Sequence, residues 1–285
     1  MRPQPDTAAP FDLAAYFERV GFDGPGEPTL ATLESLHALH PQAIAFENVD
    51  VFAGHDVPLD PQALQHKLVF SGRGGWCFEQ NLLFGGVLAQ LGFRVRQLAA
   101  RVLWNAPSGV VRPRTHMVLL VDLEANHYVV DVGFGGLTAT APLLLAPGLE
   151  QSTSHETFRV LEIDEEYLLE ARVQEDWRPL YAFDLQAQTV ADYSLTNWYL
   201  AHHPESSFRQ HLLAARVAPG CRYAVFDDEL TIHRPGIASE RRRLTDVGAL
   251  QTVLIEQLKL RLPRSAVLDD AFARIFERRR AQAAV

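Results

Sequence analysis

The stretch Ser71-Gly-Arg-Gly-Gly-Trp-Cys77-Phe-Glu-Gln-Asn81 places a cysteine between a glycine-rich loop and an apolar helix. Glycines allow backbone angles that side chains forbid, so this loop can turn sharply and approach a ligand closely. The N-terminus of a helix offers free N–H groups and partial positive charge, and both favour a thiolate over a thiol. A free cysteine beside Trp76 and Phe78 is also often a small buried apolar residue, so the stretch alone leaves both interpretations open. Cys221, which precedes an apolar strand, fits the buried interpretation.

A thiol nucleophile needs a base, and the base needs a group that orients it. Among 11 histidines, His116 opens a strongly apolar strand, and strand ends commonly display catalytic groups. Asp131 lies inside the run Tyr128–Val132, where a carboxylate is costly to bury unless it is paired. The alternative is that Asp131 accepts bonds from the backbone of the glycine turn that follows it. We favour the catalytic interpretation and predict Cys77, His116 and Asp131 as the catalytic residues.

The expected register brings His116 and Asp131 only partly together. If Glu124 to His127 form a hairpin turn, Asp131 lies opposite Leu120, on the same face as His116 but several residues away. A bulge, a strong twist or a different pairing is then needed to join the two side chains.

The flanking sequence predicts an α+β fold in three parts. Residues 1–92 are expected to form a helical domain that carries the nucleophile, with helix starts capped by Asp12, Thr29 and Asp60. Residues 93–195 are expected to form a β-domain, a sandwich or barrel, that carries His116 and Asp131. Its expected strands are Val95–Leu103, His116–Leu123, Tyr128–Val132, Arg159–Ile163, Tyr167–Ala171 and Leu180–Leu185.

Residues 196–285 are expected to mix helices and strands in a third domain. The expected helices are Asn197–His202, Phe208–Ala215, Leu250–Leu260 and Ala271–Arg280, and the expected strands are Arg222–Phe226 and Leu230–His233. The run Arg278–Arg280 is expected to be a solvated helix end.

The composition excludes several classes of protein. The formal net charge of −9 argues against nucleic acid as a partner, because phosphate binding needs a cationic surface. No apolar run is long enough to span a membrane, the N-terminus lacks the pattern of a secretory signal, and two cysteines give no disulfide framework, so we expect a cytoplasmic protein. Two cysteines also exclude an all-thiolate zinc site, and we expect no metal. The lysines Lys67 and Lys259 both lie outside glycine-rich loops, which disfavours a P-loop ATPase or a Schiff-base enzyme.

These motifs resemble the arylamine N-acetyltransferase family. The resemblance covers roughly residues 10 to 216, while the last 70 or so match only loosely. It rests on Phe46-Glu-Asn48, Arg73-Gly-Gly-Trp-Cys-Phe-Glu-Gln-Asn81, Thr115-His-Met117, Val130-Asp-Val-Gly-Phe-Gly135 and Asn197-Trp-Tyr199, and on the spacing of the three predicted catalytic residues. It implies a helical bundle, a central antiparallel β-barrel and a C-terminal α/β lid, with a papain-like Cys-His-Asp triad.

The resemblance also implies an activity. Acetyl-CoA would be the cosubstrate, with no tightly bound cofactor, and a small aromatic amine or hydrazine would be the acceptor, in a ping-pong reaction through acetyl-Cys77. Phe46 and Phe134 would line the acceptor pocket, and the backbone of Arg112, Pro113 and Thr115 would lie near coenzyme A.

The sequence departs from the family pattern at three positions: Ala45 replaces a frequent proline, Trp76 a frequent tyrosine and Gln80 a frequent histidine. Each departure is expected to alter the acceptor pocket and none removes a member of the triad. The oligomeric state and the natural acceptor stay open.

Two other activities use the same groups. A thiol hydrolase or transglutaminase-like enzyme would use the triad on peptides or glutamine, since this constellation recurs on unrelated folds. An amide synthase that releases a polyketide chain would keep the same fold. O-acetylation of N-hydroxyarylamines is a further possibility, whereas a non-enzymatic binding module does not explain the placement of Cys77.

Overall fold

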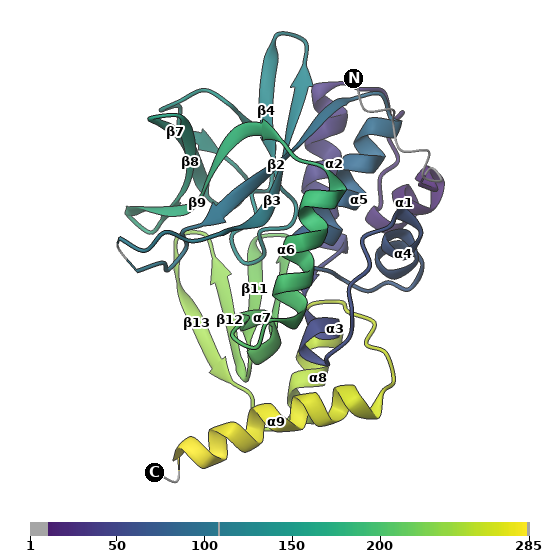
Figure 1. Ribbon diagram of the computed structural model, residues 1–285, viewed down its shortest axis with the longest axis vertical. Helices are drawn as coiled ribbons and strands as arrows, with labels where there is room; N and C mark the ends of the chain where they lie inside the picture. The colour runs from purple at the N-terminus through teal and green to yellow at the C-terminus, as the bar shows by residue number, and fades with distance from the viewer. Residues whose placement is uncertain (1–10, 108, 284–285) are drawn as a thin grey trace.

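The computed structural model describes residues 11–107 and 109–283, and they form an α+β fold built around an antiparallel barrel (Figure 1). The predicted fold class is therefore confirmed. The helices are α1 Leu13–Val20, α2 Leu30–Ala43, α3 Val49–Phe52, α4 Pro61–Gln65, the π-helical turn η1 His66–Phe70, α5 Cys77–Gln90, α6 Val190–His202, α7 Ser207–Gln210, α8 Val247–Glu256 and α9 Ala266–Ala283.

The first helices begin where their caps predict. The side chains of Asp12, Thr29 and Asp60 each accept a hydrogen bond from the backbone N–H three residues ahead. The helix after Asp60 continues into η1 and so reaches Phe70. The buried faces of α1, α2 and α5 form one apolar cluster, which also includes one face of the strand that carries His116.

The barrel is an eight-stranded sheet of order β5-β4-β3-β2-β9-β8-β7-β6, and every pairing in it is antiparallel. Its strands are β2 Arg94–Val102, β3 Arg114–Leu123, β4 Asn126–Val130, β5 Leu143–Leu144, β6 Gln151–Ser152, β7 Thr157–Ile163, β8 Glu166–Val173 and β9 Asp176–Ala187. The amide of Gln151 both accepts from Leu144 N (2.7 Å) and donates to Leu144 O (2.9 Å). This side chain therefore bridges the two edge strands and nearly closes the barrel.

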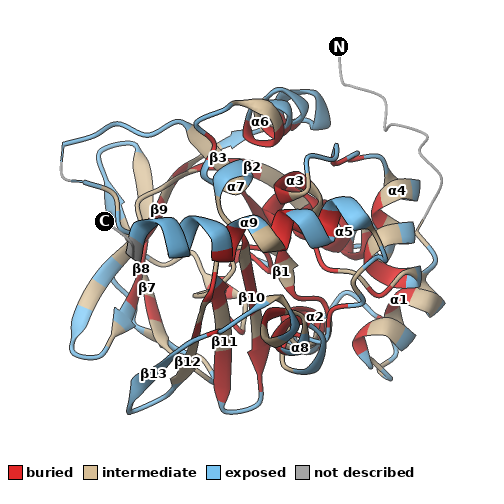
Figure 2. Ribbon diagram, turned by 90° about the horizontal axis from the view of Figure 1, so that it is seen from below, coloured by how far each residue is buried: buried red, intermediate tan, exposed pale blue. Residues whose placement is uncertain are grey.

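Strand β3 is buried on both faces, which explains its unbroken apolar run. Met117 and Leu119 pack against the helices, while Val118 and Leu120 enter the barrel core. His116 has the parity of Val118 and Leu120, and therefore faces the barrel side. Figure 2 shows the buried residues in the interior of the sheets and on the inward faces of the helices.

A second sheet, of order β1-β10-β11-β12-β13, combines one strand from the N-terminal part of the chain with four from the C-terminal part. Its strands are β1 Phe46–Glu47, β10 Leu213–Ala218, β11 Cys221–Phe226, β12 Glu229–Arg234 and β13 Ile237–Arg243. Phe46 lies opposite Ala215, so the segment before the nucleophile is an edge strand of the C-terminal sheet. The three-part division at 92/93 and 195/196 stays a prediction. Strand β1 lies in the first part but pairs with β10 of the third, and α6 runs across the second boundary.

The C-terminal part differs from the sequence-based prediction. The helix expected at Phe208–Ala215 is wrong: α7 ends at Gln210, and β10 begins at Leu213. The run Leu212–Val217 is apolar except for Arg216. An apolar run of this length fits a short buried strand as well as a buried helix. Strand β13 was not predicted, because all seven of its residues are exposed and carry no apolar alternation.

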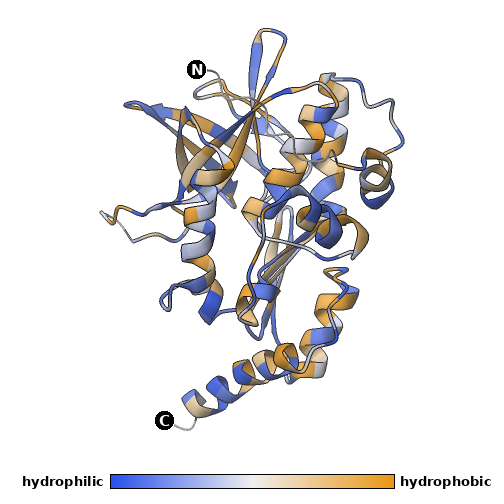
Figure 3. Ribbon diagram, turned by 45° about the vertical axis from the view of Figure 1, so that its right-hand side comes forward, coloured by the Kyte–Doolittle hydropathy of each residue, from blue (hydrophilic) through white to orange (hydrophobic). Residues whose placement is uncertain are grey.

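The last helix is amphipathic. Apolar and polar residues alternate along α9, and the apolar face packs in the cluster of the C-terminal sheet (Figure 3). Arg278–Arg280 are exposed, as the predicted solvated helix end requires. Arg278 also donates to Gln210 O (2.6 Å) and Arg279 binds Asp228 (2.7 Å), so these side chains attach the end of α9 to α7 and to the β11–β12 turn.

Candidate active site

The predicted nucleophile is the first residue of α5. The buried Cys77 follows Trp76, the N-cap residue, whose N–H donates to Glu79 Oε2 (3.1 Å). The thiol of Cys77 donates to the carbonyl of Thr115, with 3.8 Å between sulfur and oxygen. The loop and the helix start therefore place the sulfur beside the first residues of β3.

The predicted base and its orienting group form a buried pair. His116 Nε2 lies 2.7 Å from Asp131 Oδ2, and both side chains are 3% exposed. Burial lowers the pKa of His116, but the Asp131 carboxylate outweighs it and, with the hydrogen bond and charge of Cys77, raises the pKa to about 10. Burial raises the pKa of Asp131, but His116, Asn81 and the N–H of Gly133 hold it below its usual value. The imidazole is thus held as a cation between a carboxylate and the thiol.

The register that joins this pair differs from the expected one. Leu123 pairs with Asn126 across a turn of only Glu124 and Ala125, and β4 ends at Val130. If the register is continued one residue further, Asp131 falls opposite Val118, two residues from His116. The expected pairing of Asp131 with Leu120 is wrong, as is the extension of the strand through Val132. Since Asp131 already lies in the turn after β4, its carboxylate can reach the ring without a bulge in the β3–β4 pair.

The alternative role for Asp131, binding the glycine turn, exists alongside the pairing with His116. Its second oxygen, Oδ1, accepts from Gly133 N (2.9 Å) and from Asn81 Nδ2 (3.0 Å). A Cβ on Gly133 would lie 2.9 Å from Cys77 Cα, so only glycine lets the turn approach the start of α5 this closely. Both contacts considered for Asp131 are therefore present, one at each carboxylate oxygen.

Sequence reasoning missed two groups that hold this pair. Asn81, one turn after Cys77, also donates to Met117 O (2.8 Å) and accepts from Val132 N (3.1 Å), so it links α5, β3 and the Asp131 turn. His37 lies 3.1 Å from the carbonyl of Asp131. Asn81 stands in the quoted motif at one helical turn from the nucleophile, and that spacing was the available signal; His37 had none.

Cys77 and His116 line a cleft of about 1110 Å³ between the barrel, the helices and the C-terminal sheet. The predicted acceptor residues Phe46 and Phe134 line it, and so do the predicted coenzyme A residues Arg112, Pro113 and Thr115. The ring of Phe134 meets that of His116 edge-on, with 5.3 Å between centroids. Their roles in binding stay predictions.

Much of the cleft comes from residues that sequence reasoning did not select. The C-terminal sheet contributes a continuous wall, and so does the β8–β9 turn. The wall includes Ala215, Val225, Thr231, His233, Ile237 and Ser239. The region was missed because its first strand was predicted as a helix and its last strand was not predicted.

The described ranges contain neither a candidate metal site nor a candidate membrane-spanning helix. No group of three or more histidine, cysteine or acidic side chains could hold a metal ion there. None of the helices between residues 11 and 283 is long and apolar enough to cross a membrane. Cys77 and Cys221 are both free thiols, and Cys221 is buried as the sequence indicates.

Comparison with known proteins gives one consistent answer. An N-acetyltransferase family model matches residues 29–267. The arylamine N-acetyltransferase of Mycobacterium tuberculosis (strain ATCC 25618 / H37Rv) is 42% identical over 252 residues, covering 86% of this chain and 88% of the relative. An enzyme of Salmonella typhimurium, named arylamine N-acetyltransferase / N-hydroxyarylamine O-acetyltransferase, is 41% identical over 249 residues, covering 87% and 88%.

A solved structure agrees with both. The structure of Mycobacterium marinum arylamine N-acetyltransferase in complex with CoA superposes with a TM-score of 0.89 at 38% identity, over 93% of this chain and 99% of that one. A buried thiol–imidazole–carboxylate set that borders a cleft is typical of enzymes with a cysteine nucleophile, hydrolases and acyltransferases alike. The chain belongs to the arylamine N-acetyltransferase family.

Proposed function

We propose that this enzyme transfers the acetyl group of acetyl-CoA to arylamines and arylhydrazines through an acetyl-Cys77 intermediate. The observation that carries the proposal is the buried His116–Asp131 pair beside Cys77, on the border of a cleft of about 1110 Å³. A cleft of that volume accommodates a large cosubstrate together with a small acceptor. The relatives named above supply the class of substrate.

The first half-reaction forms the intermediate. The Cys77 thiolate, stabilised by the His116 imidazolium, attacks the carbonyl carbon of the thioester, and N–H groups at the start of α5 stabilise the oxyanion. The bond from carbon to the coenzyme A sulfur breaks, and the leaving thiolate takes the proton from His116. Acetyl-Cys77, free coenzyme A and neutral His116 result.

The second half-reaction regenerates the thiolate. A neutral aromatic amine attacks the acetyl-Cys77 carbonyl, and the cysteine sulfur leaves as a thiolate. His116 takes the proton released by the amine and so returns to the imidazolium, with Asp131 stabilising its charge. Weakly basic aromatic amines suit this step because they are unprotonated nucleophiles near pH 7.

We assign binding roles as part of the same proposal. Phe46 and Phe134 hold the aromatic ring of the acceptor, while the backbone of Arg112, Pro113 and Thr115 lies along coenzyme A. The enzyme needs no tightly bound cofactor and works in the cytoplasm. By the name of the Salmonella relative, N-hydroxyarylamines are a second acceptor class, in which the hydroxyl oxygen receives the acetyl group.

Steady-state kinetics with acetyl-CoA and 4-methoxyaniline tests the reaction order. A ping-pong reaction gives parallel double-reciprocal lines when each substrate is varied at several concentrations of the other. Intersecting lines would instead indicate that both substrates bind before transfer, and would exclude the acetyl-Cys77 route.

A further inference from the structure

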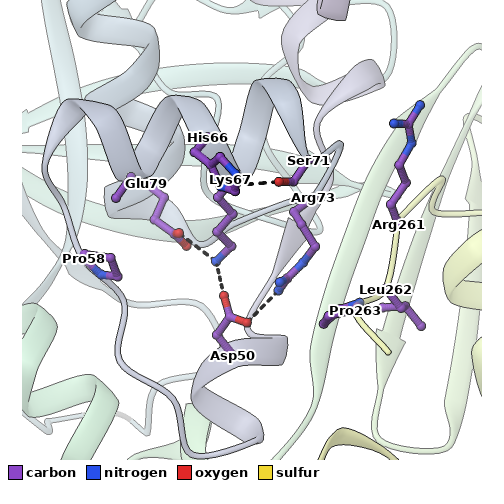
Figure 4. A pocket seen from close by; sticks show the side chains of 11 residues that line it. Asp50, Pro58, His66, Lys67, Ser71, Arg73, Glu79, Arg261, Leu262 and Pro263 are labelled. Carbon is purple, nitrogen blue, oxygen red and sulfur yellow. Dashed lines mark hydrogen bonds and ion pairs between the residues drawn. The ribbon is translucent and has the colours of Figure 1, made fainter. Parts of the chain in front are cut away.

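A lysine lies beneath the nucleophile loop, in a chain whose positive charge is almost all arginine. Lys67 Nζ lies 2.7 Å from Asp50 Oδ2 and 2.7 Å from Glu79 Oε1, and its side chain is 14% exposed. Figure 4 shows its ammonium group between the two carboxylates, with Arg73 on the other side of Asp50. Lys67 comes from η1, while its partners come from α3 and α5.

Glu79 transmits this contact to the residue before the nucleophile. One of its oxygens binds Lys67, and the other accepts from Trp76 N (3.1 Å). A Cβ on Gly75 would lie 2.6 Å from Glu79 Oε2, so the loop is closely packed on this carboxylate. Any rotation of the Glu79 side chain therefore moves either the loop or the N–H of Trp76 that it caps.

The other end of the loop is held by the same group of charges. Arg73 donates to Asp50 Oδ1 (2.9 Å) and to Glu47 Oε1 (2.9 Å and 3.1 Å). Lys67 thus connects the Arg73 end of the loop, through Asp50, with the Trp76 end, through Glu79. Both ends of the short segment that delivers Cys77 depend on this ammonium.

The charge balance makes the ammonium necessary. Lys67 and Arg73 oppose three carboxylates, those of Glu47, Asp50 and Glu79. Burial raises the pKa of Glu79 to about 7, with help from Glu47 and Asp50, even though Lys67 opposes the rise. Without Lys67, Asp50 keeps Arg73, but Glu79 loses its cation, and a buried carboxylate without a cation is costly.

Lys67 bridges two carboxylates with a single nitrogen atom. An ammonium is a compact charge with three donors on a flexible stem, whereas a guanidinium is a planar fork. The cluster borders a cavity of about 540 Å³, which is distinct from the catalytic cleft; Lys67, Arg73 and Glu79 line the first, and Cys77 lines the second. A change at Lys67 therefore acts on Cys77 from behind the loop, without touching the substrates.

We propose that Lys67 is a positioning residue: by holding Glu79 on the N–H of Trp76, it fixes the start of α5 and aims the Cys77 sulfur at His116 and the thioester. The inference rests on the proposed acetyl transfer through Cys77. Lys67 contacts no reacting atom and acts through Glu79.

The test compares Lys67→Met, Glu79→Gln and the double variant with wild type. Lys259→Met is the matched control, because Lys259 is the other lysine and is exposed. One readout is the single-turnover rate of Cys77 acetylation by acetyl-CoA, with the KM for acetyl-CoA. The second is the rate of Cys77 alkylation by iodoacetamide between pH 5 and 9, which needs no acetyl donor.

Each single variant is expected to lower the acetylation rate about 10- to 100-fold with KM changed less than about threefold, since small displacements of a reacting atom cost rates of this order. Because both residues act through one contact, the double variant should lose no more than either single one. The alkylation rate should fall in the same order of variants, and Lys259→Met should match wild type. Circular dichroism establishes that each variant is folded.

Wild-type acetylation and alkylation rates in folded Lys67→Met would overturn the proposal, and so would losses that multiply in the double variant. If Lys67→Met does not fold, Glu79→Gln decides in its place, because its amide cannot both cap Trp76 and accept from Lys67. If acetyl-CoA fails to acetylate even the wild type, the proposed function is wrong. The alkylation rates then still decide whether Lys67 positions the thiol.

Discussion

Asn81 is the residue whose polar contacts converge most closely on the triad. It donates to Asp131 and to Met117 O, and accepts from Val132 N. Asn81→Leu removes a hydrogen bond to a charged group, which is worth about 1.5–3 kcal/mol. If that energy is expressed in the transition state, kcat/KM for an arylamine falls about 10- to 100-fold.

A matched control separates this effect from lost stability. Asn197 is also buried and donates to Val57 O (2.9 Å), in α6 and outside the contacts of the triad. Asn197→Leu is expected to lower the melting temperature while leaving kcat/KM of the folded enzyme near wild type. Equal losses of kcat/KM in the two variants would mean that Asn81 has no special role.

The three proposed catalytic residues each carry a signal at a single position, whereas His37, which contacts Asp131, carries none. Cys77 follows a glycine loop, His116 opens an apolar strand and Asp131 is a charge in an apolar run, so each carries a local signal. His37 supports Asp131 from 94 positions earlier in the chain, through a backbone carbonyl. Such a contact depends on tertiary packing and leaves no pattern in sequence.

Helix α2 carries a buried histidine that makes stability depend on pH. His40 lies between Tyr16 Oη (2.7 Å) and Gln80 Oε1 (2.7 Å), and burial lowers its pKa to about 3 despite the bond to Gln80. The folded state therefore keeps this ring neutral, whereas the unfolded chain protonates it below about pH 6.5. Its contribution to stability is present above pH 6.5 and is lost as the pH falls toward 3.

Urea denaturation at pH 7.5 and pH 5 measures this effect. The free energy of unfolding of His40→Gln should fall between these values by about 1–2 kcal/mol less than that of wild type, because glutamine does not titrate. The comparison uses the change with pH, since the substitution also alters the bonds to Tyr16 and Gln80 at both values. Equal changes in the two proteins would show that His40 is not kept neutral by folding.

At the element scale, prediction succeeded where caps and periodicity agreed and failed where exposure removed the pattern. Helices α1, α2 and α5 have clear starts, and β2, β3, β7, β8 and β9 have apolar cores. Strand β13 is wholly exposed, and β10 is a buried apolar run in which a helix and a strand look alike. The cleft wall made by these strands was missed for that reason.

At the scale of the whole molecule, an ion pair with a buried arginine joins the C-terminal sheet to the β6–β7 turn of the barrel. Arg222, which is 1% exposed, donates through Nε to both oxygens of Glu156 (2.9 Å and 3.0 Å). His155, beside Glu156, lies 3.0 Å from the carbonyl of Ala218. His155 and Glu156 both line the catalytic cleft, so this junction helps to set its width.

Arg222→Met leaves Glu156 without its partner and should destabilise the fold by about 3–5 kcal/mol, the usual cost of breaking a buried pair. Because the junction borders the cleft and not the triad, KM for acetyl-CoA should rise while kcat of the folded enzyme stays within about threefold. Arg234→Met is the control for stability alone, because Arg234 also lines the cleft: its pair with Glu240 is exposed and 3.6 Å long, and is worth less than about 1 kcal/mol. A fall in kcat with an unchanged KM would contradict this assignment.

The most direct test of the account is the intact mass of the protein after brief mixing with acetyl-CoA and no amine, in wild type and Cys77→Ala. Wild type should gain one acetyl group and lose it when an arylamine is added, while Cys77→Ala should gain none, since the thiolate is the nucleophile. A folded wild type that gains no acetyl group, or a Cys77→Ala variant that turns over normally, would contradict the acetyl-cysteine mechanism.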